Sequence, residues 1–215
     1  MAVMKTRDFI AISKQLLPSL PGMVVHNGMM LAASNDAVLR GICFEGSSFD
    51  AGSFYVWSFG MQLYVPADGI NFNLGVRLRM ESGAERWHQA EDQLIVKLSN
   101  AVRIQAVPML RQLETAAGVV ELTRAAASVA SGNPHLHREL AFALAKAGEN
   151  EAALGELEVL SRRLDRQVPW QNEIARSSEA LHQCLIADPE GVPALLKQWV
   201  AENVHRLGLN GVLQV

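Results

Sequence analysis

The sequence predicts an α+β protein, with an antiparallel sheet of four or five strands packed on helices and an all-helical bundle after it. Ten of the thirteen aromatic residues lie before residue 90, and alanine, leucine and glutamate dominate the second half. Aromatic and β-branched residues favour strands, whereas Ala, Leu and Glu favour helices. Residues 72–80 also alternate strictly between apolar and polar side chains, as in a half-buried strand. We therefore expect an α+β domain over residues 1–115 and a helical domain over residues 116–215.

The first elements of the front half are short. Residues 6–17 carry the apolar stripe of a helix, and Pro18 ends it because proline cannot continue a helix. Strands are expected at residues 23–25 and 29–32, on either side of a His-Asn-Gly turn. A third strand is expected at residues 38–44.

The clearest feature is a hairpin that ends in residues 72–80. The upstream segment 57–63 has the same apolar spacing of two, and residues 66–69 (Pro-Ala-Asp-Gly) have the chemistry of a turn. Pairing Val65 with Ile70 sets a register in which apolar residues oppose apolar residues. The expected pairs are Leu63 with Phe72, Met61 with Leu74, Phe59 with Val76 and Trp57 with Leu78.

Helices are expected to follow this hairpin to the end of the chain. A long helix from about residue 84 to 113, kinked or divided at Pro108, is expected to cover the Trp57/Phe59/Leu74 face together with the first helix. Glycine and proline residues then mark the boundaries of further helices. These helices are expected near residues 118–130, 134–146, 150–164, 170–187 and 192–207.

Residues 137–160 resemble a single tetratricopeptide repeat. The matching positions are Leu140, Ala141 and Leu144 in the first helix, Gly148 in the turn, and Ala153, Leu157 and Leu160 in the second helix. His137 stands where the family prefers Trp, and no second copy follows at a period of about 34 residues, so an ordinary antiparallel helical hairpin is the alternative. Residues 5–115 faintly resemble an uncharacterised bacterial family of unknown function, through residues 40–42, 53–57 and 63–66. This second resemblance implies no activity.

Composition and charge exclude several classes of protein. The net charge is -3 and the pI about 6.1, which is unlike the basic balance of a nucleic-acid binder. The first residues contain charges and no apolar run, and no stretch reaches the roughly 18 apolar residues of a membrane span. Cys43 and Cys184 lie far apart and suit a reducing compartment. We therefore expect a cytoplasmic protein that binds neither nucleic acid nor membrane.

The sequence lacks the motifs of common catalytic and cofactor sites. It contains no G-x-x-x-x-G-K-[ST], G-x-G-x-x-G or G-x-S-x-G pattern. Glu-x-x-His, a spacing found in di-iron bundles, occurs three times, at Glu85/His88, Glu179/His182 and Glu202/His205. At about 100° per residue, none of these pairs faces the apolar side of its helix. We therefore expect solvated pairs, and we predict no catalytic residue, no metal site and no cofactor.

The candidate binding site is the polar face of the predicted hairpin. The expected register aligns two arginines, two asparagines and a tyrosine on that face. These residues are Tyr64, Asn71, Asn73, Arg77 and Arg79. Arginine and tyrosine are over-represented in binding hot spots, although the solvated outer face of an antiparallel sheet has a similar composition.

The function that these observations favour is a non-catalytic protein-binding module, such as an adaptor or an immunity protein that binds a cognate protein. Residues 114–215 carry nine Lys+Arg against thirteen Asp+Glu, which favours a protein partner with a basic surface. The oligomeric state stays open. The alternative is an enzyme or small-ligand binder that uses a cleft between sheet and bundle, with Glu45, Asp50, Arg77 or a histidine as working groups. That alternative requires a pocket with several convergent polar side chains.

Overall fold

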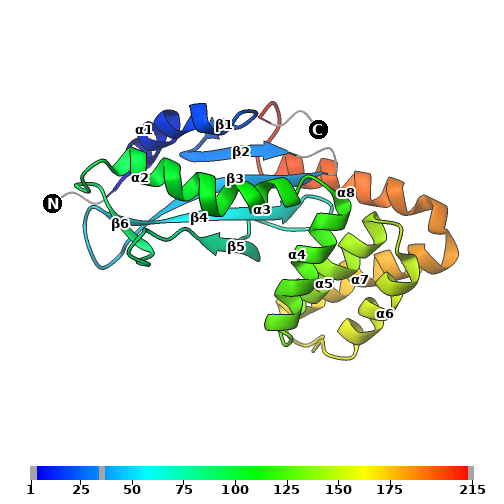
Figure 1. Cartoon of the computed structure of the whole chain (residues 1–215). Helices are drawn as coiled ribbons and strands as arrows, with labels where there is room; N and C mark the ends of the chain where they lie inside the picture. The colour runs from blue at the N-terminus through cyan, green and yellow to red at the C-terminus, as the bar shows by residue number, and fades with distance from the viewer. Residues whose placement is uncertain (1–3, 34–36, 213–215) are drawn as a thin grey trace.

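The structure, a computed structural model, describes residues 4–33 and 37–212, and it confirms the α+β class (Figure 1). The described residues contain an antiparallel sheet of six strands, one more than the upper expectation. The front elements are α1 (Thr6–Leu16), β1 (Val24–His26), β2 (Met29–Ala33), β3 (Val38–Gly46), β4 (Ser53–Gln62), β5 (Leu74–Arg77) and β6 (Arg86–His88). The strand order is β1-β2-β3-β4-β5, and β6 pairs with β4 beyond the end of β5.

The predicted register of the hairpin is wrong by one residue. In β4 and β5, Trp57 lies opposite Arg77 and Phe59 lies opposite Gly75, whereas Leu78 and Val76 were the expected partners. The connection between the strands is also longer than a four-residue turn, because β4 ends at Gln62 and β5 begins at Leu74. A shift of one residue moves every side chain of β5 to the other face of the sheet.

In this register Phe59 lies opposite small residues. Phe59 lies opposite Gly41 on β3 and Gly75 on β5, so a glycine flanks its ring on both sides. A Cβ atom on Gly41 would lie 2.7 Å from the Phe59 ring, which leaves no room for a side chain there. Phe72, in the connection before β5, packs edge-on against Phe59 with 4.8 Å between the ring centroids.

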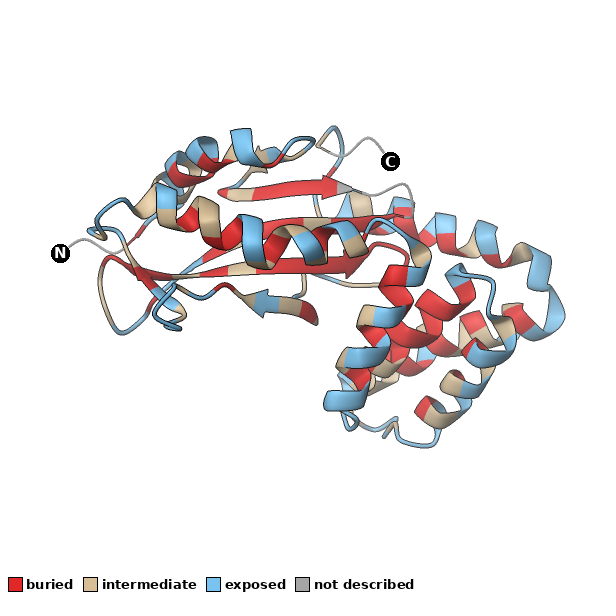
Figure 2. Cartoon of the chain, in the orientation of Figure 1, coloured by how far each residue is buried: buried red, intermediate tan, exposed pale blue. Residues whose placement is uncertain are grey.

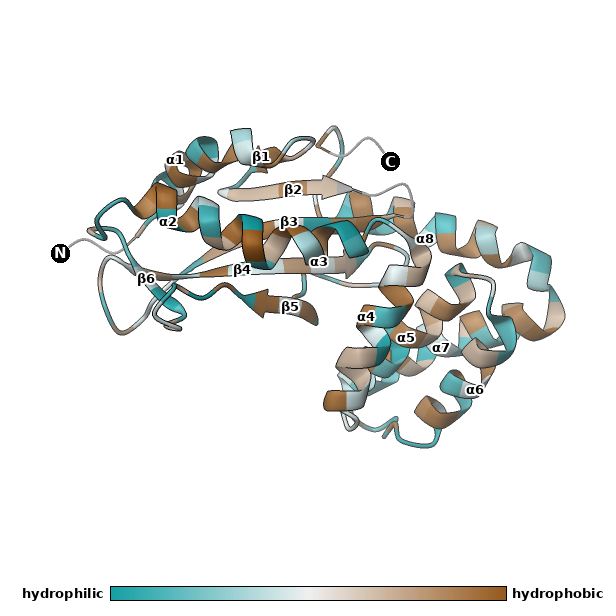
Figure 3. Cartoon of the chain, viewed as in Figure 1, coloured by the Kyte–Doolittle hydropathy of each residue, from teal (hydrophilic) through white to brown (hydrophobic). Residues whose placement is uncertain are grey.

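The helices cover the opposite face of β4 from the one that was predicted. Phe54 and Val56 belong to the buried cluster that includes α1 and the central helix, whereas Trp57 and Phe59 point away from these helices. Helix α2 (Leu94–Ala101) and helix α3 (Val107–Gln112) run across the sheet in front of β3 and β4 (Figure 1). Apolar residues recur along β4 (Figure 3), with Phe54 and Val56 on one face and Phe59 and Met61 on the other, so the sequence pattern alone did not select the covered face.

The central helix begins about ten residues later than predicted. Residues 86–88 form β6, and the ring of Trp87 is buried with its Nε1 donating to the carbonyl oxygen of Leu78 at 3.1 Å. A π-helical turn over residues 102–106 joins α2 to α3 immediately before Pro108. Proline lacks an N–H group and its ring crowds the carbonyl four residues earlier, so a wider turn accommodates it without ending the helix.

The helices of the back half lie where the sequence predicts them. They are α4 (Ala116–Val129), α5 (Pro134–Lys146), α6 (Asn150–Ser161), α7 (Pro169–Ala187) and α8 (Val192–Arg206). Helix α5 is the centre of the bundle, since it packs against α4, α6, α7 and α8 and its residues 138–145 are all buried (Figure 2). Helices α5 and α6 form the antiparallel hairpin that resembles a tetratricopeptide repeat; membership of that family stays a prediction.

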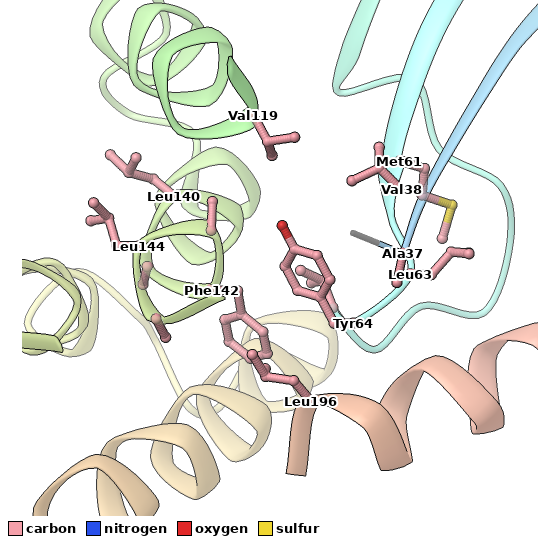
Figure 4. Close-up of a cluster of buried hydrophobic side chains, with 14 of the residues drawn as sticks. Ala37, Val38, Met61, Leu63, Tyr64, Val119, Leu140, Phe142, Leu144 and Leu196 are labelled. Carbon is pink, nitrogen blue, oxygen red and sulfur yellow. The ribbon is translucent and has the colours of Figure 1, made fainter. Parts of the chain in front are cut away.

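A hydrophobic cluster joins the two halves of the molecule. It includes Leu63 and Tyr64 from the end of the sheet, Val119 on α4, Phe142 on α5 and Leu196 on α8 (Figure 4). The boundary predicted at residues 115 and 116 stays a prediction, although α4 begins there. Among the described residues, no helix combines the length and hydrophobicity that crossing a membrane requires.

Candidate functional site

The structure separates the five residues of the predicted binding strip. Tyr64 is only 1% exposed and lies between the end of the sheet and helices α4 and α5 (Figure 4). Arg79 is exposed and its side chain contacts Glu85, while its backbone N–H donates to the Gln105 side chain at 2.8 Å. Asn71 lies in the connection before β5, where its Oδ1 accepts from the backbone N–H of Asn73 at 3.3 Å. The common polar face does not form because it depended on the predicted register.

Arg77 lies instead against two aromatic side chains of β4. Its guanidinium carbon is 4.3 Å from the ring centroid of Tyr55 and 4.6 Å from that of Trp57, which is cation–π geometry. Glu45 and Glu85 lie at ion-pair distances of 3.7 and 3.6 Å from the same guanidinium. All of these side chains are partly or fully accessible to solvent. The group forms an ordered, charge-balanced patch on the sheet.

Asn71 and Asn73 line a cavity of about 420 Å³, which we call the junction cavity. It lies between residues 66–73, after β4, and helices α5, α7 and α8 of the bundle. Ligand pockets typically have volumes of roughly 300–1,000 Å³, so this cavity has room for a small molecule. Besides the two asparagines, its walls include His135, Arg138, Trp170 and Ile174.

Helix α8 holds the sheet side of the junction cavity in place. The side chain of Asn203 is buried, and its Nδ2 donates to the carbonyl oxygens of Leu63 and Val65 at 2.7 Å each. Its Oδ1 accepts from the backbone N–H of Ala67 at 3.2 Å. Arg206, one turn further along α8, donates to the Ala67 carbonyl oxygen at 3.3 Å. One helix therefore satisfies backbone groups of three residues in the segment that follows β4.

A buried carboxyl group lies behind the asparagines. Glu139 on α5 is 3% exposed, and its Oε1 accepts a hydrogen bond from Asn73 Nδ2 at 2.7 Å. Burial raises the pKa of Glu139 from 4.5 to about 7, against the lowering effects of the Asn73 hydrogen bond and the Arg138 charge. The carboxyl group therefore gains or loses a proton near neutral pH.

Arg138 brings a positive charge to the base of the junction cavity. It is 7% exposed, and its Nε is buried without a hydrogen-bond partner. Its Nη1 donates to Ser177 Oγ at 3.5 Å, and among the described residues its Nη2 has no acceptor and its guanidinium has no ion-pair partner. Burial lowers the pKa of Arg138, but an arginine keeps its proton at neutral pH. A buried charge without a direct counter-ion is unusual, because burial of a charge is costly.

Two stacked rings form another wall of the junction cavity. The rings of His135 and Trp170 are nearly parallel, at 11°, with centroids 5.3 Å apart. His135 lies in the first turn of α5, where Asn133 caps the helix by accepting from the His135 backbone N–H. Burial, and then the charge of Arg138, lower the pKa of His135, so the imidazole is held in its neutral form.

The acidic residues proposed for an enzymatic alternative lie elsewhere. Glu45 accepts from Trp57 Nε1 at 2.9 Å, Asp50 accepts from Ser53 Oγ at 2.6 Å, and neither lines the junction cavity. Of the groups named for that alternative, only a histidine, His135, is present there. The part of the chain that the structure describes contains no cluster of three His, Cys, Asp or Glu side chains suited to a metal ion.

The three Glu-x-x-His glutamates have other partners. Glu85 pairs with arginines of β5 and of the segment after it, and Glu179 on α7 pairs with Arg166. Glu202 on α8 accepts from Gln198 at 2.8 Å. Glu202 is exposed, and Glu85 and Glu179 are partly exposed.

The buried residues Arg138 and Glu139 were missed because only the apolar residues of α5 were considered. The signal was present: residues 140–145 read Leu-Ala-Phe-Ala-Leu-Ala, a helix that is apolar on all sides. Such a helix is surrounded by others, so charged residues one turn earlier are expected to be buried as well.

Comparisons of the chain with models of protein families, with curated proteins and with solved structures find no match. Function therefore has to be argued from the site itself.

Proposed function

We propose that this protein binds a small molecule in the junction cavity, as the small-ligand alternative of the sequence analysis expected. The observation that carries the proposal is the buried guanidinium of Arg138 at the base of a cavity of about 420 Å³, with one buried N–H left without a partner. Unsatisfied buried polar groups are rare in folded proteins, and a ligand is one of the few ways to satisfy them. Around it, Asn71, Asn73 and His135 supply further polar groups.

Local rigidity also supports a binding function. The sheet side of the junction cavity is held by the three hydrogen bonds of Asn203, and the helical side belongs to α5, the central helix of the bundle. A wall fixed before the ligand arrives costs less ordering entropy on binding. A second large cavity, of about 470 Å³, lies beside α2. The charges of Lys97 and Glu91 in its wall already pair with each other, so these two residues leave no unpaired charge for a ligand.

The test is a fragment screen monitored by amide and indole NMR signals. A hit should shift the indole N–H of Trp170 and the side-chain amides of Asn71 and Asn73. Gly69 lines the cavity in open space at a backbone angle that any residue adopts, so Gly69→Trp should fold and block the hits. Gly155→Trp, in equally open space on α6, is the matched control and should leave binding unchanged. A screen with no hit that Gly69→Trp abolishes would contradict the proposal.

A second candidate function is the protein-binding module that the sequence favours. The observation behind it is the patch formed by Arg77, Tyr55 and Trp57, since these residue types dominate binding hot spots. The test is affinity capture with the wild type and with Arg77→Gln. A stoichiometric partner retained by the wild type and lost by the variant would support this function. A monodisperse monomer that captures nothing would count heavily against it.

A further inference from the structure

Of the charged residues that line the junction cavity, Arg138 is the buried one, and it forms no ion pair among the described residues. Arg206 pairs with Asp68 at 3.1 Å, and both are largely exposed at the rim. Glu139, which is buried, and Glu173, which is exposed, both favour the charged form of Arg138, but neither forms an ion pair with it. His135 is held neutral by burial and by Arg138. A ligand that brings a negative charge to ion-pair distance of Arg138 would therefore offset part of the cost of burying this guanidinium.

The free groups of Arg138 favour a carboxylate. Nη1 is used by Ser177, which leaves Nε and Nη2 without acceptors among the described residues. These two nitrogens form one edge of the guanidinium, and a carboxylate binds such an edge through two parallel hydrogen bonds. Nε is shielded from water in the structure, so a carboxylate that enters the cavity pairs with this edge only after the Arg138 side chain moves enough to expose Nε.

Phosphate is a poorer match for this cavity. A phosphate dianion is usually held by several cations or by a row of backbone N–H groups at a helix N-terminus. Here a single buried arginine is available, and the carboxylates of Asp68 and Glu173 line the same cavity and would repel a second negative charge. A monoanion avoids most of that repulsion.

The remaining walls favour an apolar body on the ligand. Trp170 presents an aromatic ring that is backed by His135, and Pro66 and Ile174 add aliphatic surface. Burial of apolar surface contributes roughly 25 cal/mol per Å², so such contacts can supply most of the affinity of a small ligand. We propose that the ligand of the junction cavity is a small monocarboxylate with an apolar body, whose carboxylate pairs with Arg138. This inference rests on the proposed function.

The test is isothermal titration calorimetry with matched pairs of probes. Benzoate, phenylacetate and hexanoate are each compared with the corresponding neutral primary amide, and inorganic phosphate is titrated separately. Since hydrogen bonds to charged groups are the strong ones, we expect at least one acid to bind at least tenfold more tightly than its amide and more tightly than phosphate. Gly69→Trp should abolish this binding, whereas Gly155→Trp should not.

Two variants identify the arginine that binds the carboxylate. Arg138→Gln should weaken binding of the acid at least tenfold and leave binding of the amide within about threefold, whereas Arg206→Gln should leave both within about threefold. Thermal unfolding checks that each variant is folded. If Arg138→Gln does not fold, Arg138→Lys replaces it, because lysine keeps the charge and loses the two-nitrogen edge.

Several outcomes would overturn the inference. They are equal binding of every acid and its amide, tighter binding of phosphate than of any acid, and loss of acid binding in Arg206→Gln alone. Absence of carboxylates from the fragment hits would also overturn it. If other fragments still bind and Gly69→Trp still abolishes their binding, the proposed function stands and only the ligand class is wrong. If no fragment binds, both fail.

Discussion

Replacement of Glu139 by glutamine should change how the stability of the protein depends on pH. The carboxyl group is 3% exposed, and glutamine has the same shape and an oxygen that can accept the hydrogen bond from Asn73 Nδ2. The essential difference is that glutamine has no proton to lose. Glu139→Gln therefore isolates the contribution of one buried titration.

The sign and size of the effect follow from the two pKa values. The unfolded carboxyl group titrates near 4.5, whereas in the folded protein burial raises the pKa of Glu139 to about 7. Between these pH values the folded state keeps a proton that the unfolded state has released, so the free energy of unfolding falls as pH rises. One pKa unit corresponds to about 1.4 kcal/mol, so the total loss is about 3 kcal/mol. It is absent below the unfolded pKa and complete above the folded pKa.

The measurement is urea unfolding of wild type and variant at a series of pH values from about 4.5 to about 8. The unfolding free energy of Glu139→Gln, minus that of the wild type, should rise by about 3 kcal/mol across this range. Glu202→Gln, on the exposed side of α8, is the control, and its difference from the wild type should stay within about 0.5 kcal/mol. A difference for Glu139→Gln that stays constant with pH would refute the argument that burial keeps this carboxyl group protonated.

Three further predictions concern single side chains. Asn203→Ala removes three hydrogen bonds to backbone groups and should lower the free energy of unfolding by about 3 kcal/mol, as measured by urea titration. A loss below about 1 kcal/mol would mean that water replaces the amide. Gly41→Ala places a Cβ atom 2.7 Å from an aromatic ring and 2.8 Å from a carbonyl oxygen, so it should lower the free energy of unfolding by about 1–3 kcal/mol in the same titrations. Gly46→Ala, in open space on the same strand, is the control and should lower it much less. Burial raises the pKa of Cys43 to about 11, so iodoacetamide should modify it more slowly at about pH 8 than Cys184, as followed by mass spectrometry. Equal rates would contradict the raised pKa of Cys43.

The helical half was predictable because its signals are local. Pro134 begins α5, Gly148 takes a left-handed backbone angle of 80° in the turn after it, and Pro169 begins α7. Each residue acts on its own neighbours in the sequence, through a fixed angle or a missing N–H group. The positions of these helices therefore do not depend on how the rest of the molecule folds.

The sheet was less predictable because its register depends on distant residues. Gly75 lies opposite Phe59 and against the backbone of Phe72 in the connection, where a Cβ atom would lie 2.8 Å from the Phe72 carbonyl oxygen. Residues 86–88 form a strand only because residues 53–55 of β4 offer a free edge. Periodicity within one segment carries no information about such partners.

The candidate site combines residues that the sequence analysis selected with residues that it missed. Asn71 and Asn73 were selected for a polar strip, and they line the junction cavity for a different reason, because the connection before β5 folds against the bundle. Arg138 was missed because the number of helices around α5 is a property of the tertiary structure. A charged pair directly before a run that is apolar on all sides of a helix nevertheless indicates buried charges from the sequence alone.

The hydrogen bonds of Asn203 also bear on the order in which the protein folds during synthesis. Its partner at Leu63 lies 140 residues earlier in the chain, so the end of β4 leaves the ribosome long before α8 exists. Until then the carbonyl oxygens of Leu63 and Val65 face water, and Leu63 lacks its contacts with the bundle. Contacts over such distances slow folding. During synthesis, this end of the sheet therefore keeps unpaired carbonyl groups and exposed apolar residues until α8, more than a hundred residues later in the chain, has been made.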